Sequence, residues 1–246
     1  MASPPAGHIV AMGGGGFLME PENPLLDDFV LGLARRKPAR VCFLPTASGD
    51  AASTVARFYR AFSGRSIPSD LTLFESSVLP RRPPKTTDLP SFVAEHDVFY
   101  VGGGSTANLL ALWRLHGLDR LLRDACRAGA VLAGVSAGMN CWFEGSVTDS
   151  FGGLGPLADG LGFLAGSACP HYDGEPERRP TYRRLVGSEL ADGYAADDGA
   201  ALHFVDGALV EAVSSRPSAS AYRVEGRGSE VIEERLPVRY LGTGAT

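Results

Sequence analysis

The chain has 246 residues, of which 44% are hydrophobic and 21% are charged, and its formal net charge is −5. This composition is typical of a globular protein with one domain, and the small negative charge argues against a nucleic-acid-binding surface. No apolar run is long enough for a membrane span, and residues 1–7 lack the basic and apolar parts of a secretion signal. The four cysteines lack metal-ligand spacing, so we expect no metal and no cofactor. Together these features predict a cytoplasmic chain without a nucleic-acid or membrane partner.

The first two thirds of the chain alternate strand-like and helix-like segments. Apolar runs predict strands, and apolar residues at helical spacing predict helices. Strands separated by helices predict right-handed crossovers and a parallel sheet covered on both faces. The expected strands are 8–12, 40–45, 70–74, 97–101 and 131–135; the expected helices are 24–36, 51–62, 106–116, 118–129 and 139–143; prolines place a loop at 79–88.

From about Gly199 the pattern changes to short strands with tight turns, expected at 200–205, 208–213, 221–225 and 230–236. Asp206-Gly207 is a hairpin signal. We therefore expect one domain over 1–246, with loose tails at 1–7 and 241–246. Its architecture would be a three-layer α/β/α fold with a mostly parallel central sheet and a β-rich C-terminal edge.

Gly134-Val-Ser-Ala-Gly138 carries the strongest chemical signal. It follows an apolar strand and precedes a predicted helix, which is the context of a nucleophile elbow. The Ser136 hydroxyl would stand above the sheet edge where open parallel sheets bind ligands, and the Ala137 N–H would point toward a developing oxyanion. The alternative interpretation is a structural turn.

A nucleophilic serine needs a base, and the chain has five histidines. His171 follows Cys169-Pro170 and opens a charged loop, a typical position for a general base, although a surface histidine fits the position equally well. The other four lie in predicted strands or near helix ends, where packing or solvation is the ordinary role: His8, His96, His116 and His203.

The imidazole in turn needs a carboxylate to hold its tautomer. Spacing does not choose among the available acids, except that Asp173 is only two residues from His171 and poorly placed to reach the far ring nitrogen. The candidates are Asp149, Asp173, Asp197, Asp198 and Asp206.

Two glycine-rich stretches, 13–16 and 102–104, each follow a predicted strand. Neither has the spacing of a dinucleotide or nucleotide-phosphate loop. For the second stretch, backbone exposed to substrate is the better interpretation, with the Gly103 N–H as a second oxyanion donor. Tight turns are the alternative, and for 13–16 they are at least as well supported.

Taken together, these motifs resemble the peptidase E family, the serine hydrolases that also include cyanophycinases. Each piece is weak alone, but jointly they are specific and cover about residues 8–205. The resemblance implies a fold similar to class I glutamine amidotransferases. The matching pieces are Ile9-Val-Ala-Met-Gly-Gly-Gly15, Phe43-Leu-Pro-Thr-Ala47, Tyr100-Val-Gly-Gly-Gly104, Gly134-Val-Ser-Ala-Gly138, Pro170-His171 and Asp198-Gly199.

Carried over by position, the resemblance implies Ser136 as nucleophile, His171 as general base and Asp198 as the third member of a Ser-His-Asp triad. Gly103 and Ala137 would form the oxyanion hole. The family commonly has Glu-Gly where this chain has Asp198-Gly199, so the shorter carboxylate must approach the histidine more closely.

Peptidase E cleaves dipeptides with an N-terminal aspartate, and in the family an arginine after the histidine reads that acidic side chain. Here the corresponding loop offers Arg178 and Arg179, with Arg183 and Arg184 one turn further on. A forked guanidinium suits a carboxylate. The resemblance therefore implies a serine peptidase that hydrolyses short peptides through an acyl-enzyme, with N-terminal aspartyl dipeptides as candidate substrates.

Three alternatives stay open. The first is a cyanophycinase-like or carboxypeptidase-type specificity, and the second is a non-catalytic binding or regulatory protein on the same fold. The third is an amidotransferase-like glutaminase, which would need a cysteine at the elbow, whereas the nearest is Cys141. A small peptide is the expected partner, and a homodimer through the β-rich tail or a sheet edge is compatible with the sequence.

Overall fold

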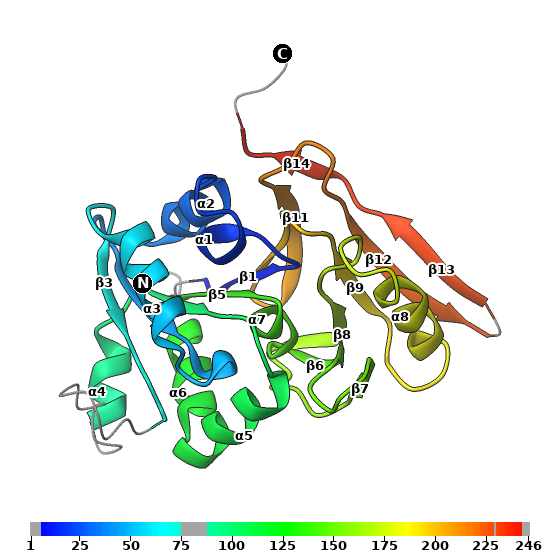
Figure 1. The fold of residues 1–246 in the computed structure, drawn as a ribbon, viewed down its shortest axis with the longest axis horizontal. Helices are drawn as coiled ribbons and strands as arrows, with labels where there is room; N and C mark the ends of the chain where they lie inside the picture. The colour runs from blue at the N-terminus through cyan, green and yellow to red at the C-terminus, as the bar shows by residue number, and fades with distance from the viewer. Residues whose placement is uncertain (1–5, 75–87, 229, 243–246) are drawn as a thin grey trace, which may run out of the picture.

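The computed structural model describes residues 6–74, 88–228 and 230–242. Two β-sheets and the helices around them make up this part of the chain (Figure 1). The first sheet has eight strands in the order β14-β11-β10-β1-β5-β4-β2-β3. Their bounds are His8–Met12 (β1), Arg40–Leu44 (β2), Ile67–Asp70 (β3), Val98–Val101 (β4), Val131–Val135 (β5), Ala200–Val205 (β10), Ala208–Ser214 (β11) and Val238–Tyr240 (β14).

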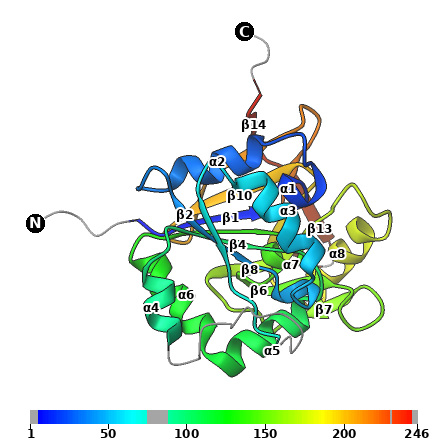
Figure 2. The ribbon, with the colours of Figure 1, turned by 60° about the vertical axis from the view of Figure 1, so that its left-hand side comes forward.

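The neighbouring strands β1, β5, β4, β2 and β3 run parallel to one another. Strand β10 pairs antiparallel with β1, and β11 pairs antiparallel with β10. The central strands are apolar throughout because both faces are covered: Ile9 and Ala11 point into one core cluster, and Val10 and Met12 into the other. Figure 2 shows α1, α2 and α3 on one side of the sheet and α4, α5 and α6 on the other. The predicted three-layer α/β fold with a mostly parallel central sheet is therefore confirmed.

Local signals set the ends of several helices. Ser105 caps α5 by accepting the Asn108 N–H at 3.3 Å, and Gly117, at φ 69°, ends α5 and starts α6. The helices are α1 (Gly16–Met19), α2 (Leu25–Leu33), the 3-10 turn η1 (Thr46–Ser48), α3 (Ala52–Phe62), α4 (Leu89–Ala94), α5 (Thr106–His116), α6 (Leu118–Arg127), α7 (Ala137–Asn140) and α8 (Arg178–Val186). Within the described ranges, none of them is long and apolar enough to span a membrane.

The second sheet has six strands in the order β13-β12-β9-β8-β6-β7. Its middle strands β6, β8 and β9 run parallel, and β7, β12 and β13 are antiparallel to their neighbours. Helix α8 covers its outer face. The bounds are Phe143–Thr148 (β6), Gly155–Leu157 (β7), Leu164–Cys169 (β8), Gly193–Ala196 (β9), Ala221–Arg227 (β12) and Glu230–Arg235 (β13).

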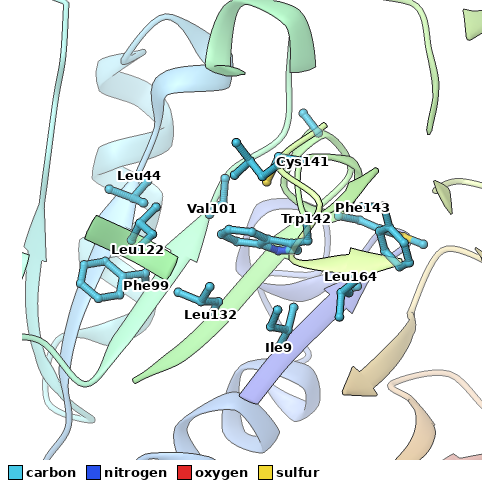
Figure 3. Packing of buried hydrophobic residues seen from close by; sticks show 14 of the residues in the cluster. Ile9, Leu44, Phe99, Val101, Leu122, Leu132, Cys141, Trp142, Phe143 and Leu164 are labelled. Atoms are coloured by element: carbon cyan, nitrogen blue, oxygen red, sulfur yellow. The ribbon is translucent and has the colours of Figure 1, made fainter. Parts of the chain in front are cut away.

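Trp142 lies at the centre of the core that the two sheets share. Its ring is fully buried and lies 6.0 Å from that of Trp113 and 5.6 Å from that of Phe163. Figure 3 shows the indole among Val101 of the first sheet and Leu164 of the second. The two sheets are thus joined by one continuous apolar core.

The C-terminal edge is more divided than predicted, because β10, β11 and β14 extend the first sheet while β12 and β13 belong to the second. The strand expected at 70–74 is β3, Ile67–Asp70; beyond it the Asp50 carboxylate, instead of β2, accepts the N–H groups of Leu73 and Phe74. The helix expected at 139–143 is α7, which begins directly after the serine and ends at Asn140, with two residues between it and the start of β6 at Phe143.

The ends of the domain also differ from the prediction. Gly7 exchanges hydrogen bonds with Asp206, and the Leu241 N–H donates to the Ser214 oxygen, so both residues are held by the first sheet. Gly7 and Leu241 are therefore held by the fold, whereas the prediction placed both in loose tails. The predicted loop at 79–88 lies outside the described residues except for Asp88.

Candidate active site

Ser136 occupies a strained turn between β5 and α7. Its backbone has φ 60° and ψ −113°, a conformation that costs a non-glycine residue about 1–3 kcal/mol. The motif glycines make the turn possible: a Cβ on Gly134 would lie 2.2 Å from the Gly138 oxygen, and one on Gly138 would lie 2.6 Å from the Val101 oxygen. The strand–turn–helix geometry of a nucleophile elbow is therefore present.

The serine is half-exposed, whereas Val135 and Ala137 on either side are buried. Gly103, in the loop after β4, faces it: a Cβ on Gly103 would lie 3.2 Å from Ser136 Cβ and 3.6 Å from Oγ. The Ala137 N–H begins α7 and has no helical acceptor, and within the described ranges no backbone carbonyl accepts the Gly103 N–H. Two unused backbone donors thus lie beside the hydroxyl.

His171 follows β8 and also has a positive φ, 53°. Its ring Nδ1 lies 2.6 Å from Asp198 Oδ1. This carboxylate assigns the proton of the neutral ring to Nδ1 and leaves Nε2 as an acceptor. The Ser136 hydroxyl has no hydrogen-bond partner among the described residues; in sites of this kind the serine–histidine bond often tightens only around a substrate.

Asp198 is the acid that reaches the imidazole. Its backbone N–H donates to Asp173 Oδ1 at 2.8 Å, which orients the turn that carries it. The hydrogen bond from His171, followed by the charges of His171, Arg216 and Arg178, holds the Asp198 pKa below its ordinary value against the effect of burial. The remaining candidates lie elsewhere: Asp149 beside Arg178, Asp197 against the Ser220 N–H, and Asp206 against the Gly7 N–H.

The backbones of Ser136, His171 and Asp198 contact three consecutive residues where β1 ends. Each of these residues makes a backbone contact with one member of the group, so the exit of β1 brings the elbow, the histidine loop and the acidic turn together. The contacts are the Ser136 N–H to the Met12 oxygen at 3.1 Å, the His171 N–H to the Gly13 oxygen at 3.2 Å, and a parallel bridge between Gly14 and Asp198.

The glycines at 13 and 14 are required for these contacts. A Cβ on Gly13 would lie 2.2 Å from the Ala196 oxygen, and one on Gly14 would lie 2.0 Å from Asp198 Oδ1. On the sequence alone, a tight turn was at least as well supported for residues 13–16 as a functional role, so these contacts were not predicted. The signal that could have revealed it is a glycine run at the end of a parallel strand, where backbones approach closely.

The two predicted substrate-binding arginines begin α8 and are both paired. Arg178 is only 4% exposed, and its Nε lies 2.7 Å from Glu175 Oε2. Arg179 is exposed, forms an ion pair with Glu233 and lies over the rings of Tyr172, in the histidine loop, and Tyr222, on β12. Arg183 also approaches Glu233, at 3.5 Å.

Two further charged residues, Arg216 and Glu20, lie beside the turn that carries Asp198. Arg216 contributes to the lowered pKa of Asp198, and the two side chains pair with each other. No sequence motif marks them, since they come from the segments after β11 and α1, far apart along the chain.

The thiols take no part in this arrangement. Cys141, five residues after Ser136, is fully buried, and burial raises the pKa of its thiol well above the ordinary value. Across the described ranges no group of three or more His, Cys, Asp or Glu side chains is arranged to hold a metal ion. A hydroxyl, a carboxylate-bound imidazole and two backbone donors form a constellation suited to acyl transfer.

The sequence matches the model of peptidase family S51 over residues 9–211. It is 55% identical over 237 residues to the "Uncharacterized peptidase YgaJ" of Bacillus subtilis (strain 168), a match that covers 96% of this chain and 99% of that protein.

Two solved structures share the fold. The crystal structure of a peptidase from an acI-B1 Actinobacterium superposes with a TM-score of 0.67 at 16% identity, covering 95% of each chain. The structure of a "Putative Peptidase E Protein" from Listeria monocytogenes EGD-e gives a TM-score of 0.55 at 19% identity, covering 96% of this chain and all of that one.

Proposed function

The chain belongs to peptidase family S51 and is a serine-type peptidase, and from that premise we propose that it hydrolyses short peptides through a Ser136-His171-Asp198 triad. The observation that supports this most directly is the common attachment of the elbow and the histidine loop to Met12 and Gly13.

In the proposed reaction, Ser136 Oγ attacks the scissile carbonyl carbon while His171 Nε2 takes the hydroxyl proton. Asp198 keeps the other ring proton on Nδ1 and stabilises the imidazolium. The N–H groups of Gly103 and Ala137 stabilise the oxyanion, each contributing about 3 kcal/mol. The imidazolium then gives its proton to the leaving amine as the C–N bond breaks. A water molecule, deprotonated by the same imidazole, attacks the acyl carbon, and the imidazolium returns that proton to Ser136 Oγ as the C–O bond breaks and the acid product leaves.

For the substrate we propose short peptides with an acidic N-terminal residue, including dipeptides that begin with aspartate. Arg178 is the better of the two candidate arginines because its charge acts on Asp198, behind the stronger effect of the His171 hydrogen bond. Its Nη1 has no partner among the described residues, so the guanidinium can bind a substrate carboxylate while Nε stays on Glu175. Arg179 is instead committed to Glu233.

Substitution of the nucleophile tests the proposal. Ser136→Ala should lower kcat/KM about 10³-fold or more on a panel of Asp-X dipeptides, isoaspartyl peptides and longer peptides. Ser188→Ala, which removes an exposed hydroxyl at the end of α8, is the matched control and should leave the rate unchanged.

The same panel separates the alternative specificities. Preference for isoaspartyl or longer peptides would indicate a cyanophycinase-like or carboxypeptidase-type enzyme. Full activity in Ser136→Ala would eliminate the triad, and mass-spectrometric detection of a fluorophosphonate adduct on Ser136 would argue against a purely binding protein.

We also propose that the enzyme acts in the cytoplasm. All four cysteines carry free thiols, and Cys42, Cys141 and Cys169 are buried, as expected of a chain that folds in a reducing compartment.

A further inference from the structure

The turn at Asp198-Gly199 is flanked by a charged residue that belongs to none of the recognised motifs. Arg216 lies in the segment after β11, and its Cγ and Cδ would each be 2.9 Å from a Cβ placed on Gly199. The neighbouring Ser215 N–H donates to the Gly199 oxygen at 2.8 Å. The aliphatic part of Arg216 therefore lies directly against the turn that carries Asp198.

Glu20 holds this arginine from the other side. The residue follows α1, and its carboxylate accepts Arg216 Nε on Oε1 and Ser215 Oγ, at 2.6 Å, on Oε2. Asn23 adds a hydrogen bond from Nδ2 to the Ser215 oxygen at 3.0 Å. These contacts join the segment after α1 to the segment after β11; Figure 1 labels both elements.

The pairing leaves part of the guanidinium uncommitted. Nε is bound to Glu20, whereas Nη1 and Nη2 have no hydrogen-bond partner among the described residues. The side chain is 41% exposed, and the Glu20 side chain only 10%. Glu20 is thus the fixed member of the pair, and it determines where the arginine's charge lies.

Several other charges face the His171–Asp198 pair, so the contribution of Arg216 has to be judged among them. The charge of Arg216 lowers the Asp198 pKa, ranking behind the hydrogen bond and charge of His171 and ahead of the charge of Arg178. Further charged groups lie on neighbouring segments: Asp173 and Glu175 in the histidine loop, Asp197 directly after β9, and Glu20 directly after α1.

We propose that Arg216, oriented by Glu20, is a positioning residue that sets the proton affinity of the His171–Asp198 pair. This proposal rests on the proposed function of the triad. A positive charge beside the carboxylate favours its ionised form, so Arg216 keeps Asp198 charged, and able to hold the His171 Nδ1–H, to lower pH. Glu20 offsets part of that charge and fixes its place.

The test is a carbon-13 NMR titration of the Asp198 carboxyl group in the Ser136→Ala background, in which the readout needs no turnover. Asp198→Asn assigns the resonance. Arg216→Gln should raise the Asp198 midpoint by about 0.5 pH unit, as expected for one partly screened charge at several ångströms. Arg216→Lys, which keeps the charge, should move it by less than half as much, and Arg120→Gln, an exposed arginine on α6, should not move it.

Glu20→Gln supplies a second variant that does not depend on Arg216→Gln folding well, and it should lower the midpoint because a negative charge is lost. An unchanged midpoint in both folded variants would overturn the proposal.

With Ser136 restored, the acid limb of kcat/KM should move with the NMR midpoint. If the midpoint moves and the enzyme shows no such limb, the triad mechanism fails while the role of Arg216 in setting the proton affinity stands.

Discussion

The two sheets are held by different chemistry. In the first, the central strands β1, β2, β4 and β5 present almost nothing but buried apolar side chains to the helices on both faces. In the second, the strands also place buried hydroxyls in the interior; Ser167 Oγ, for example, lies 2.8 Å from the Tyr182 hydroxyl and donates to the Ala191 oxygen at 2.6 Å.

The candidate site lies where these two regions meet. Ser136 ends a strand of the first sheet, His171 follows a strand of the second, and Asp198 lies in the turn that leads from β9 to β10, from one sheet to the other. The comparison indicates that apolar packing fixes Ser136, whereas directional hydrogen bonds place His171. Four substitutions test this division, in order of decreasing effect.

Gly134→Ala should have the largest effect, because its Cβ would lie 2.2 Å from the Gly138 oxygen, a backbone atom that cannot turn away. We expect a loss of about 3 kcal/mol or more in unfolding free energy and loss of peptidase activity. Gly153→Ala, where a Cβ meets nothing within 4 Å, is the control and should stay within about 0.5 kcal/mol of wild type in urea denaturation. Equal stability of the two variants would contradict the packing argument.

Phe58→Ala tests the apolar side of the comparison. The Phe58 ring is fully buried on α3 and stacks on Phe43 and Phe62 at centroid distances of 5.1 and 4.8 Å. Truncation leaves a cavity and should cost about 3–5 kcal/mol, measured by chemical denaturation. A loss of less than about 1 kcal/mol in unfolding free energy would show that the apolar packing of α3 does not stabilise the first sheet.

Asp27 is the polar exception beneath the first sheet, and it should make stability depend on pH. Desolvation raises its pKa from 3.8 to about 7, against the opposing hydrogen bond from the Tyr100 hydroxyl at 2.9 Å. Between pH 4 and 7 the folded protein keeps a proton that the unfolded chain has lost, so stability falls as pH rises through this window.

Asp27→Asn keeps the acceptor for Tyr100 and removes the titration. Near pH 4 the variant should match wild type, and above pH 7 it should be more stable by up to about 4 kcal/mol. Urea denaturation at pH 4.5 and 7.5 measures the difference; parallel pH profiles for the two proteins would refute the assignment.

Tyr182→Phe should have the smallest effect and tests the polar side. It removes one hydroxyl bonded to Ser167, whose Oγ still donates to the Ala191 oxygen. We expect a loss of about 1 kcal/mol, since the partner keeps a bond. Tyr182 packs against Tyr172 of the histidine loop, with ring centroids 6.2 Å apart. We therefore expect kcat to fall even where the protein remains folded. A thermal melt and steady-state kinetics on the same sample separate the two.

The first sheet could be read from the sequence because its strands are continuous apolar runs, and β1, at His8–Met12, and β5, at Val131–Val135, match the predicted ranges. In the second sheet the sequence predicted β12 and β13, at 221–225 and 230–236, but gave no bounds for β6, β7, β8 or β9. Strands such as Leu164–Cys169, with the sequence LAGSAC, are rich in small residues, and their pairing depends on partners distant in the chain. Neither periodicity nor propensity marks such strands.

The same contrast holds for the site. The elbow at Ser136 can be predicted from a local motif, because its glycines are needed where the backbone of the turn approaches neighbouring backbone atoms closely. By contrast, only a tertiary contact shows that Asp198, and none of the four other candidate aspartates, reaches His171. Family resemblance pointed to that residue where spacing could not. Arg216 and Glu20 lie beyond both kinds of reasoning, because only the folded chain brings residues 20 and 216 together.

The consecutive contacts of Met12, Gly13 and Gly14 have a consequence for biosynthesis. Their partners are reached only after the ribosome has made residues 136, 171 and 198, the last of them in the final fifth of the chain. Until then β1 has an open edge where β10 will pair, and His171 has no carboxylate partner. A nascent chain that has not reached residue 198 therefore holds Ser136 and His171 without the carboxylate that the imidazole contacts in the folded protein.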